Sequence, residues 1–134
     1  MLCQFTFKNF KSFYNEATLD MQATSISGHE ESLLTDRDGQ KFLPLAVIYG
    51  PNGGGKSTVL EAFAFLVSAV MRPINMLKND KEVKARNSIG AVPFKFSEKS
   101  IGEPSEFEVF FRTEVAEYRY NLKLKENVIV YESL

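Results

Sequence analysis

The chain has few residues of the kinds that mark secreted or metal-binding proteins. Of its 134 residues, one is cysteine, one is histidine and none is tryptophan. The lone Cys3 excludes an internal disulfide and a cysteine-rich zinc site, and it agrees with a reducing compartment. We therefore expect a domain that is stabilised by its apolar core, with Cys3 as a small core side chain and His29 exposed to solvent.

Long apolar runs are missing as well. The N-terminus alternates apolar and polar residues, whereas a signal peptide has a continuous apolar segment. The longest apolar stretch, residues 59–71, is interrupted by Glu61 and Ser68 and is shorter than the roughly 20 residues that a membrane span needs. The sequence therefore predicts a cytoplasmic protein with no membrane segment.

An excess of either charge is absent. Sixteen Lys and Arg against seventeen Asp and Glu give a net charge of -1. This balance offers no general attraction to polyanions, so a nucleic-acid partner stays possible only through a local patch and is not indicated by charge. With 44% apolar and 25% charged residues, the composition is that of one folded domain.

The N-terminal third predicts two strands and a polar excursion. Residues 2–8 alternate apolar with polar side chains, which is typical of a half-buried strand, and residues 9–12 read as a turn. A second strand is expected within residues 17–21, so that residues 1–21 hold the N-terminal strands. Residues 22–41 are rich in Ser, Thr, Gly and acidic side chains, and we expect a loop there.

Residues 42–72 predict a strand, a glycine loop and a helix. The apolar, β-branched run up to Tyr49 is typical of a strand buried on both faces of a sheet. Apolar residues at helical spacing follow from Ser57 to Met71, and Pro73 is expected to stop the helix. The run from Lys78 to Arg86 mixes both charge signs and is expected to be a solvated helix.

The last part of the chain, residues 88–134, predicts an antiparallel β-region. Phe107, Val109 and Phe111 share one face of an expected strand. The segment 118–125 alternates apolar and polar residues, and a third run follows a turn at Glu126-Asn127. We expect a meander with one face exposed to solvent.

One motif carries chemistry. Residues 50–57 match the phosphate-binding pattern G-x-x-x-x-G-K-[ST], between an expected strand and an expected helix. The residues expected to bind a nucleotide here are Asn52, Gly53, Gly54, Gly55, Lys56, Ser57 and Thr58.

The residue types in this loop suit a polyphosphate. Glycines allow the backbone N–H groups to approach the anion and to turn towards it, and the start of a helix adds unpaired N–H groups. Lys56 would reach the β- and γ-phosphates, and the Ser57 hydroxyl would ligate Mg²⁺. A nucleoside triphosphate with Mg²⁺ is therefore expected at this loop.

The sequence GPNGGGKST, followed by LEAF, resembles the loop of ABC-class ATPases of the SMC and RecF-like branch. Upstream, Asn9-Phe10-Lys11-Ser12-Phe13 is similar to the N-F-[KR]-S turn of that branch. The later β-region resembles that of bacterial AAA-type ATPases of this group, several of which serve in phage defence. The resemblance implies an α/β fold, a P-loop NTPase lobe with a mixed sheet, the phosphate loop between strand and helix, and an antiparallel β-subdomain. It also implies ATP as the nucleotide, so ATP and Mg²⁺ are the expected cofactors.

The resemblance also implies roles for residues outside the loop. Lys11 and Ser12 would lie beside the bound nucleotide, and Asn52 would help to position the γ-phosphate side of the site. Several elements of the family are not found in the sequence: an apolar strand that ends in Asp-Glu, the L-S-G-G signature, a switch histidine and the loop glutamine. Tyr131 stands where the strand's aspartate would be. No catalytic residue set is therefore complete in this chain.

Two functions remain open from the sequence. The first is the ATP-binding N-terminal lobe of an SMC/RecF-like ATPase, a truncated product in which hydrolysis requires downstream motifs from the remaining C-terminal lobe and a homodimer. The second is a non-catalytic interaction module that uses nucleotide binding as a regulatory device. A small GTPase or kinase is a weaker third option, since no N-K-x-D guanine motif occurs. Under the first hypothesis the isolated chain binds ATP and does not turn it over.

Overall fold

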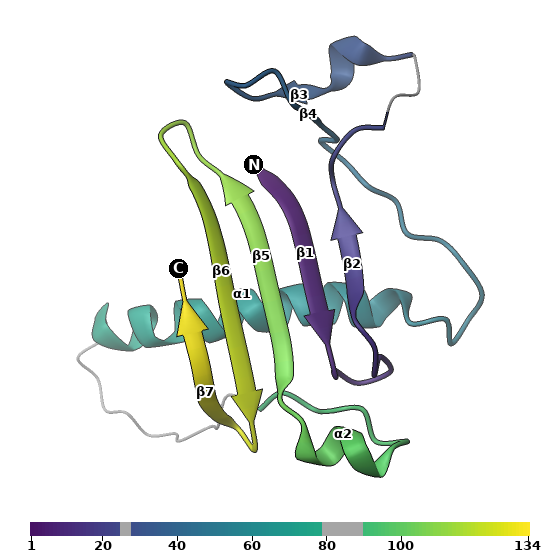
Figure 1. Ribbon diagram of the computed structural model, residues 1–134, viewed down its shortest axis with the longest axis vertical. Helices are drawn as coiled ribbons and strands as arrows, with labels where there is room; N and C mark the ends of the chain where they lie inside the picture. The colour runs from purple at the N-terminus through teal and green to yellow at the C-terminus, as the bar shows by residue number, and fades with distance from the viewer. Residues whose placement is uncertain (25–27, 79–89) are drawn as a thin grey trace.

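An antiparallel sheet and one long helix form most of the computed structural model, which describes residues 1–24, 28–78 and 90–134 (Figure 1). The helix α1 spans Lys56–Lys78 and lies across one face of the sheet. The strand order in the sheet is β2-β1-β5-β6-β7. These strands are β1 (Leu2–Lys8), β2 (Ala17–Asp20), β5 (Ser105–Arg112), β6 (Glu117–Lys125) and β7 (Val128–Ser133).

The alternation in β1 decides which face of the sheet is buried. Cys3, Phe5 and Phe7 point to the core, while the residues between them lie on the opposite, polar face. The predicted strand at residues 2–8 is confirmed. β1 pairs antiparallel with β5, with Phe5 opposite Val109, so the N-terminal strands belong to the same sheet as the C-terminal β-region.

The core lies between α1 and this apolar face. Ala62, Leu66 and Ala69 recur on one side of α1 and are buried. Phe63 meets Phe5 edge to face at 5.1 Å between ring centroids, an arrangement that aromatic pairs favour. The residues of the buried cluster are Phe5, Phe7, Phe10, Ala62, Leu66, Ala69, Phe107, Leu122 and Leu124.

The predicted C-terminal meander is confirmed. β5, β6 and β7 pair antiparallel in chain order, and Phe107 faces Leu122 across the first pair. Glu126 and Asn127 both have positive φ, at 50° and 65°, as the two central residues of a tight hairpin turn require.

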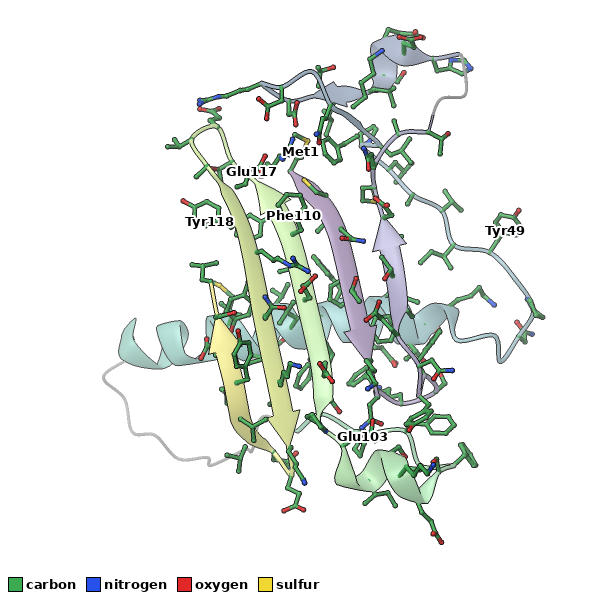
Figure 2. The ribbon with its side chains drawn as sticks, in the orientation of Figure 1. Met1, Tyr49, Glu103, Phe110, Glu117 and Tyr118 are labelled. Carbon is green, nitrogen blue, oxygen red and sulfur yellow. The ribbon has the colours of Figure 1, made fainter. Side chains whose placement is uncertain are left out.

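The predicted strand at residues 42–49 is wrong. Only Lys41–Phe42 (β4) is a strand there, and Leu45, Val47 and Tyr49 are 73%, 75% and 91% exposed. Figure 2 shows Tyr49 on the connection to α1, directed away from the sheet. A strand that is buried on both faces needs hydrogen-bonding neighbours, and none of the strands within the described ranges pairs with this segment. All strand pairs described are antiparallel, so the expected mixed sheet is also not found in them.

The helix extends further than predicted. α1 begins at Lys56 and continues through Pro73 to Lys78, so the prediction that Pro73 ends it is wrong. A proline removes one backbone hydrogen bond from a helix, a cost that the rest of the helix can offset. No described helix is long and apolar enough to cross a membrane. The charged run predicted as a solvated helix falls, after Lys78, outside the described residues.

The polar excursion contains more structure than the expected loop. It holds a short 3-10 helix, η1 (Glu30–Ser32), and a small sheet of β3 (Leu34–Thr35) and β4. Figure 1 shows this part at the end of the sheet where β1 begins.

An arginine with a largely buried side chain attaches the excursion to the sheet. Arg112, at the end of β5, forms ion pairs with Asp36 and Glu117, and its guanidinium carbon lies 5.4 Å and 5.6 Å from the ring centres of Phe42 and Phe110. The side chains of Arg112 and Asp36 are only 10% and 6% exposed. These contacts order a segment whose composition alone predicts a loop.

Candidate phosphate-binding site

The glycine loop leads directly into the N-terminus of α1. Gly53 and Gly55 adopt positive φ, 81° and 82°, the left-handed backbone region that favours glycine, whereas Gly54 does not. The N–H of Gly54 donates to the carbonyl of Pro51 at 3.2 Å and closes a tight turn. Asn52, Gly53 and Gly54 are exposed. The loop therefore presents its backbone to solvent at the positive end of the helix dipole.

Lys56 is the first residue of α1, and its side chain folds over the loop. Its Nζ donates to the carbonyl oxygens of Gly50 and Pro51 at 2.9 Å and 2.8 Å. Ser57 is exposed, and Thr58 is buried at 8%. The lysine and the two hydroxyl residues of the motif thus occupy the first turn of the helix.

The turn after β1, residues 9–13, packs against this loop. Ser12 Oγ and Thr58 Oγ1 lie 2.8 Å apart. A Cβ atom added to Gly55 would lie 2.7 Å from Cε2 of Phe13, so a side chain at residue 55 would collide with the Phe13 ring. The structure brings the two sequence motifs into direct contact, while contact of either one with a nucleotide stays a prediction.

Lys11 projects from the same turn towards α1. Its Nζ forms a 2.8 Å ion pair with Glu61 Oε2 and lies 5.7 Å from the centre of the Phe10 ring. Its backbone has φ of 49°, and its N–H donates to the carbonyl of Val92 at 2.8 Å. A third segment of the chain therefore helps to fix the position of Lys11.

Asn9 is the residue that sequence reasoning missed. It is fully buried, and its amide nitrogen donates to the carbonyls of Ser100 and Glu103 at 2.8 Å and 3.0 Å. Its amide oxygen accepts the N–H of Phe94 at 3.0 Å. These contacts bind the short helix α2 (Glu98–Gly102) to the turn. Asn9 is the first residue of the N-F-K-S motif, and this position was the sequence signal for its structural role.

The remaining single residues behave as the sequence predicts. Cys3 is 2% exposed, and burial raises the pKa of its thiol. His29 is exposed and lies 3.6 Å from Glu31. In the described part of the chain, no group of three or more His, Cys, Asp or Glu side chains is placed to hold a metal ion.

The residues of the loop fit a nucleotide phosphate by type and place. Open glycine backbone, the first N–H groups of a helix and a lysine are donors for phosphate oxygens. A hydroxyl such as that of Ser57 supplies one oxygen ligand to Mg²⁺, which takes its other ligands from phosphate and water. A glycine loop that ends in lysine and serine at a helix N-terminus defines the class of P-loop nucleotide-binding proteins.

Comparison with known proteins gives the family. The model of the family described as "AAA domain, putative AbiEii toxin, Type IV TA system" matches residues 45–134, well over half of the chain. The chain belongs to this family and is a P-loop domain of the AAA ATPase type. A search of curated proteins finds no match.

Proposed function

We propose that the chain binds Mg-ATP as the N-terminal lobe of an SMC/RecF-like ABC-class ATPase. The observation that carries the proposal is the contact between its two motifs. The turn of residues 9–13 lies on the phosphate loop through Ser12 with Thr58 and Phe13 with Gly55. Chance similarity in two short segments gives no reason for them to meet in the fold, whereas a shared binding site does.

Each residue of the site has a role in this proposal. The backbone N–H groups of Gly53 and Gly55 hold phosphate oxygens, and that of Gly54 joins them when it leaves the Pro51 carbonyl. Asn52 lines the γ-phosphate side. Lys56 neutralises charge on the β- and γ-phosphates, for which its Nζ leaves the loop carbonyls. Bound Mg²⁺ would supply further neutralisation of the phosphates, with Ser57 as its ligand from this chain.

The exposed apolar surface supports a second lobe as partner. Leu45, Val47 and Tyr49 form an extended segment without strand partners in the described ranges, and α1 carries a further exposed apolar stripe. The exposed apolar residues of α1 include Leu60, Val67, Val70 and Met71. We propose that the C-terminal lobe of the same ATPase covers both surfaces and pairs with the segment 43–49.

Hydrolysis is then a property of the assembly. Phosphoryl transfer needs an organised metal ion and an oriented water, which one loop does not provide. We propose that the second lobe and a homodimer supply the carboxylate strand and the signature motif.

The binding claim is tested by titration calorimetry with Mg-ATP. Lys56→Ala removes a charge-assisted phosphate contact and should weaken binding about 10- to 100-fold. Lys95→Ala is the control, because Lys95 is an exposed lysine outside the site. Equal affinities of the wild type and Lys56→Ala would show that the loop does not bind the phosphates as proposed.

A phosphate-release assay tests the assignment as a lobe. The chain alone, saturated with Mg-ATP, should show no turnover above background. Sustained hydrolysis that disappears in Lys56→Ala would contradict the need for a second lobe, and Glu61 and Glu132 would then be the first carboxylates to examine.

A further inference from the structure

Both cations at the phosphate loop are held by acceptors of the protein itself. Lys56 Nζ is bonded to two carbonyls of its own loop, and Lys11 Nζ is paired with Glu61. An anion that uses either charge must therefore compete with these acceptors. The two lysines differ in what holds them, because Lys56 has neutral partners and Lys11 has a carboxylate.

The backbone of Lys11 is held by the turn, while its side chain is partly exposed. Phe10 and Phe13 exchange two backbone hydrogen bonds of 2.9 Å across the turn, and the N–H of Lys11 is bonded to Val92. Its side chain is 39% exposed, and that of Glu61 is 49% exposed. A half-exposed ion pair of this kind is weak and exchanges readily with other partners.

Glu61 lies close to the place where a phosphate group would bind. It is four residues after Ser57 on α1, so the two side chains share one face of the helix, about 5–6 Å apart at Cβ. Its carboxylate therefore draws the ammonium of Lys11 to a point one turn from the helix N-terminus. A carboxylate at this distance also repels a polyphosphate.

We propose that Glu61 is an internal competitor for Lys11, and that it lowers the affinity of the site for polyphosphates. In the nucleotide-free protein the carboxylate holds the lysine beside the loop. When a polyphosphate binds, its higher negative charge attracts the Lys11 ammonium, and the ion pair of Lys11 with Glu61 breaks. The inference rests on the proposed Mg-ATP site and assigns to it a residue that sets its affinity.

The test is a comparison of four variants by calorimetry with Mg-ATP and with inorganic tripolyphosphate. Glu61→Gln keeps the side-chain shape and removes the charge, and it should tighten binding of both ligands about three- to tenfold. Lys11→Met should weaken binding. Adding Glu61→Gln to Lys11→Met should restore only the part of the affinity that is lost to repulsion between Glu61 and the polyphosphate. The control is Glu30→Gln, which removes a carboxylate of η1 that is paired with Lys41 of β4. Strand β4 lies at the opposite end of the sheet from the turn after β1 (Figure 1).

The outcomes separate this inference from the proposed function. Tighter binding by Glu61→Gln, with a smaller gain when Lys11 is already Met, supports the competition. If the wild type binds and Glu61→Gln binds equally or more weakly, the inference is overturned and the proposed function stands. A gain of the same size in Glu30→Gln also overturns it, since net charge then explains the effect. Absence of binding in every variant overturns both.

Discussion

Replacing Gly55 by alanine should separate the turn of residues 9–13 from the phosphate loop. The new Cβ atom would lie 2.7 Å and 2.8 Å from Cε2 and Cζ of Phe13. Normal carbon contacts are about 3.5–4.0 Å, so the ring must move by nearly 1 Å or more. Phe7 confines the ring, since it packs edge to face against Phe13 at 5.1 Å between centroids. This contact restricts the movement that would relieve the collision.

The magnitude follows from two separate costs. A non-glycine residue at a φ of 82° costs about 1–2 kcal/mol, and overpacking costs a further 1–3 kcal/mol or so. Gly53 isolates the second cost, because its φ is 81° and an added Cβ would meet no atom within 4 Å. Gly55→Ala should therefore destabilise the fold by about 1–3 kcal/mol more than Gly53→Ala.

Urea unfolding of the two variants measures this difference in the free energy of unfolding. Phe13→Leu replaces the ring by a smaller side chain. The stability losses of Phe13→Leu and Gly55→Ala should therefore be non-additive in the double variant. Equal stability losses in Gly53→Ala and Gly55→Ala would refute the packing of Phe13 on the loop, and with it the argument that joins the two motifs.

Two further predictions concern residues around the site and the sheet. Asn9→Ala should cost about 2–4 kcal/mol, because it leaves the Phe94 N–H and buried carbonyls unpaired and places alanine at a φ of 52°. Asn127→Ala, at a φ of 65° in an exposed turn, should cost only about 1 kcal/mol, and equal losses by urea unfolding would contradict the role of the Asn9 amide. Burial and the Glu132 carboxylate raise the pKa of the Tyr120 hydroxyl, so the folded state keeps this proton after the unfolded chain has lost it. Stability should therefore fall as pH rises through about 10, and Tyr120→Phe should fall less steeply in thermal melts over that range; identical slopes would count against this linkage.

The local β-structure was predictable from the sequence because its alternation is strong. Strands β1, β5 and β6 follow the period of two in their sequences, whereas β7 begins with a continuous apolar run. The turn between β6 and β7 contains Asn127, a residue type that tolerates positive φ. The pairing of β1 with β5 could not be predicted, since no local pattern reports which distant strands become neighbours.

The two segments whose structure differs from the sequence-based prediction share one physical cause. The segment 43–49 has the composition of a buried strand, but a strand forms only where neighbours bond to its backbone. The excursion up to Phe42 has the composition of a loop, yet the largely buried ion pair of Arg112 with Asp36 attaches it to the sheet. In both places the outcome depends on residues far away in the sequence. The phosphate loop was recognisable because its chemistry requires a fixed local spacing.

The same limit applies to the site. Lys11 and Ser12 were predicted beside a bound nucleotide from a resemblance. The structure places Ser12 against Thr58 and Lys11 against Glu61, and their contact with a nucleotide stays a prediction. Asn9 and the pairing of Lys11 with Glu61 were not predicted, because both depend on the spatial position of α1 and α2.

The most direct test of the account is a titration of ¹⁵N-labelled protein with Mg-ATP, followed by the amide signals in NMR spectra. Saturable shifts should be largest at residues 53–58 and should form a second group at residues 11–13, because the two motifs line one site. The amides of β7 should change little. Shifts confined to other parts of the chain, or no saturable shift at residues 53–58, would contradict the claim that this loop and this turn bind the nucleotide together.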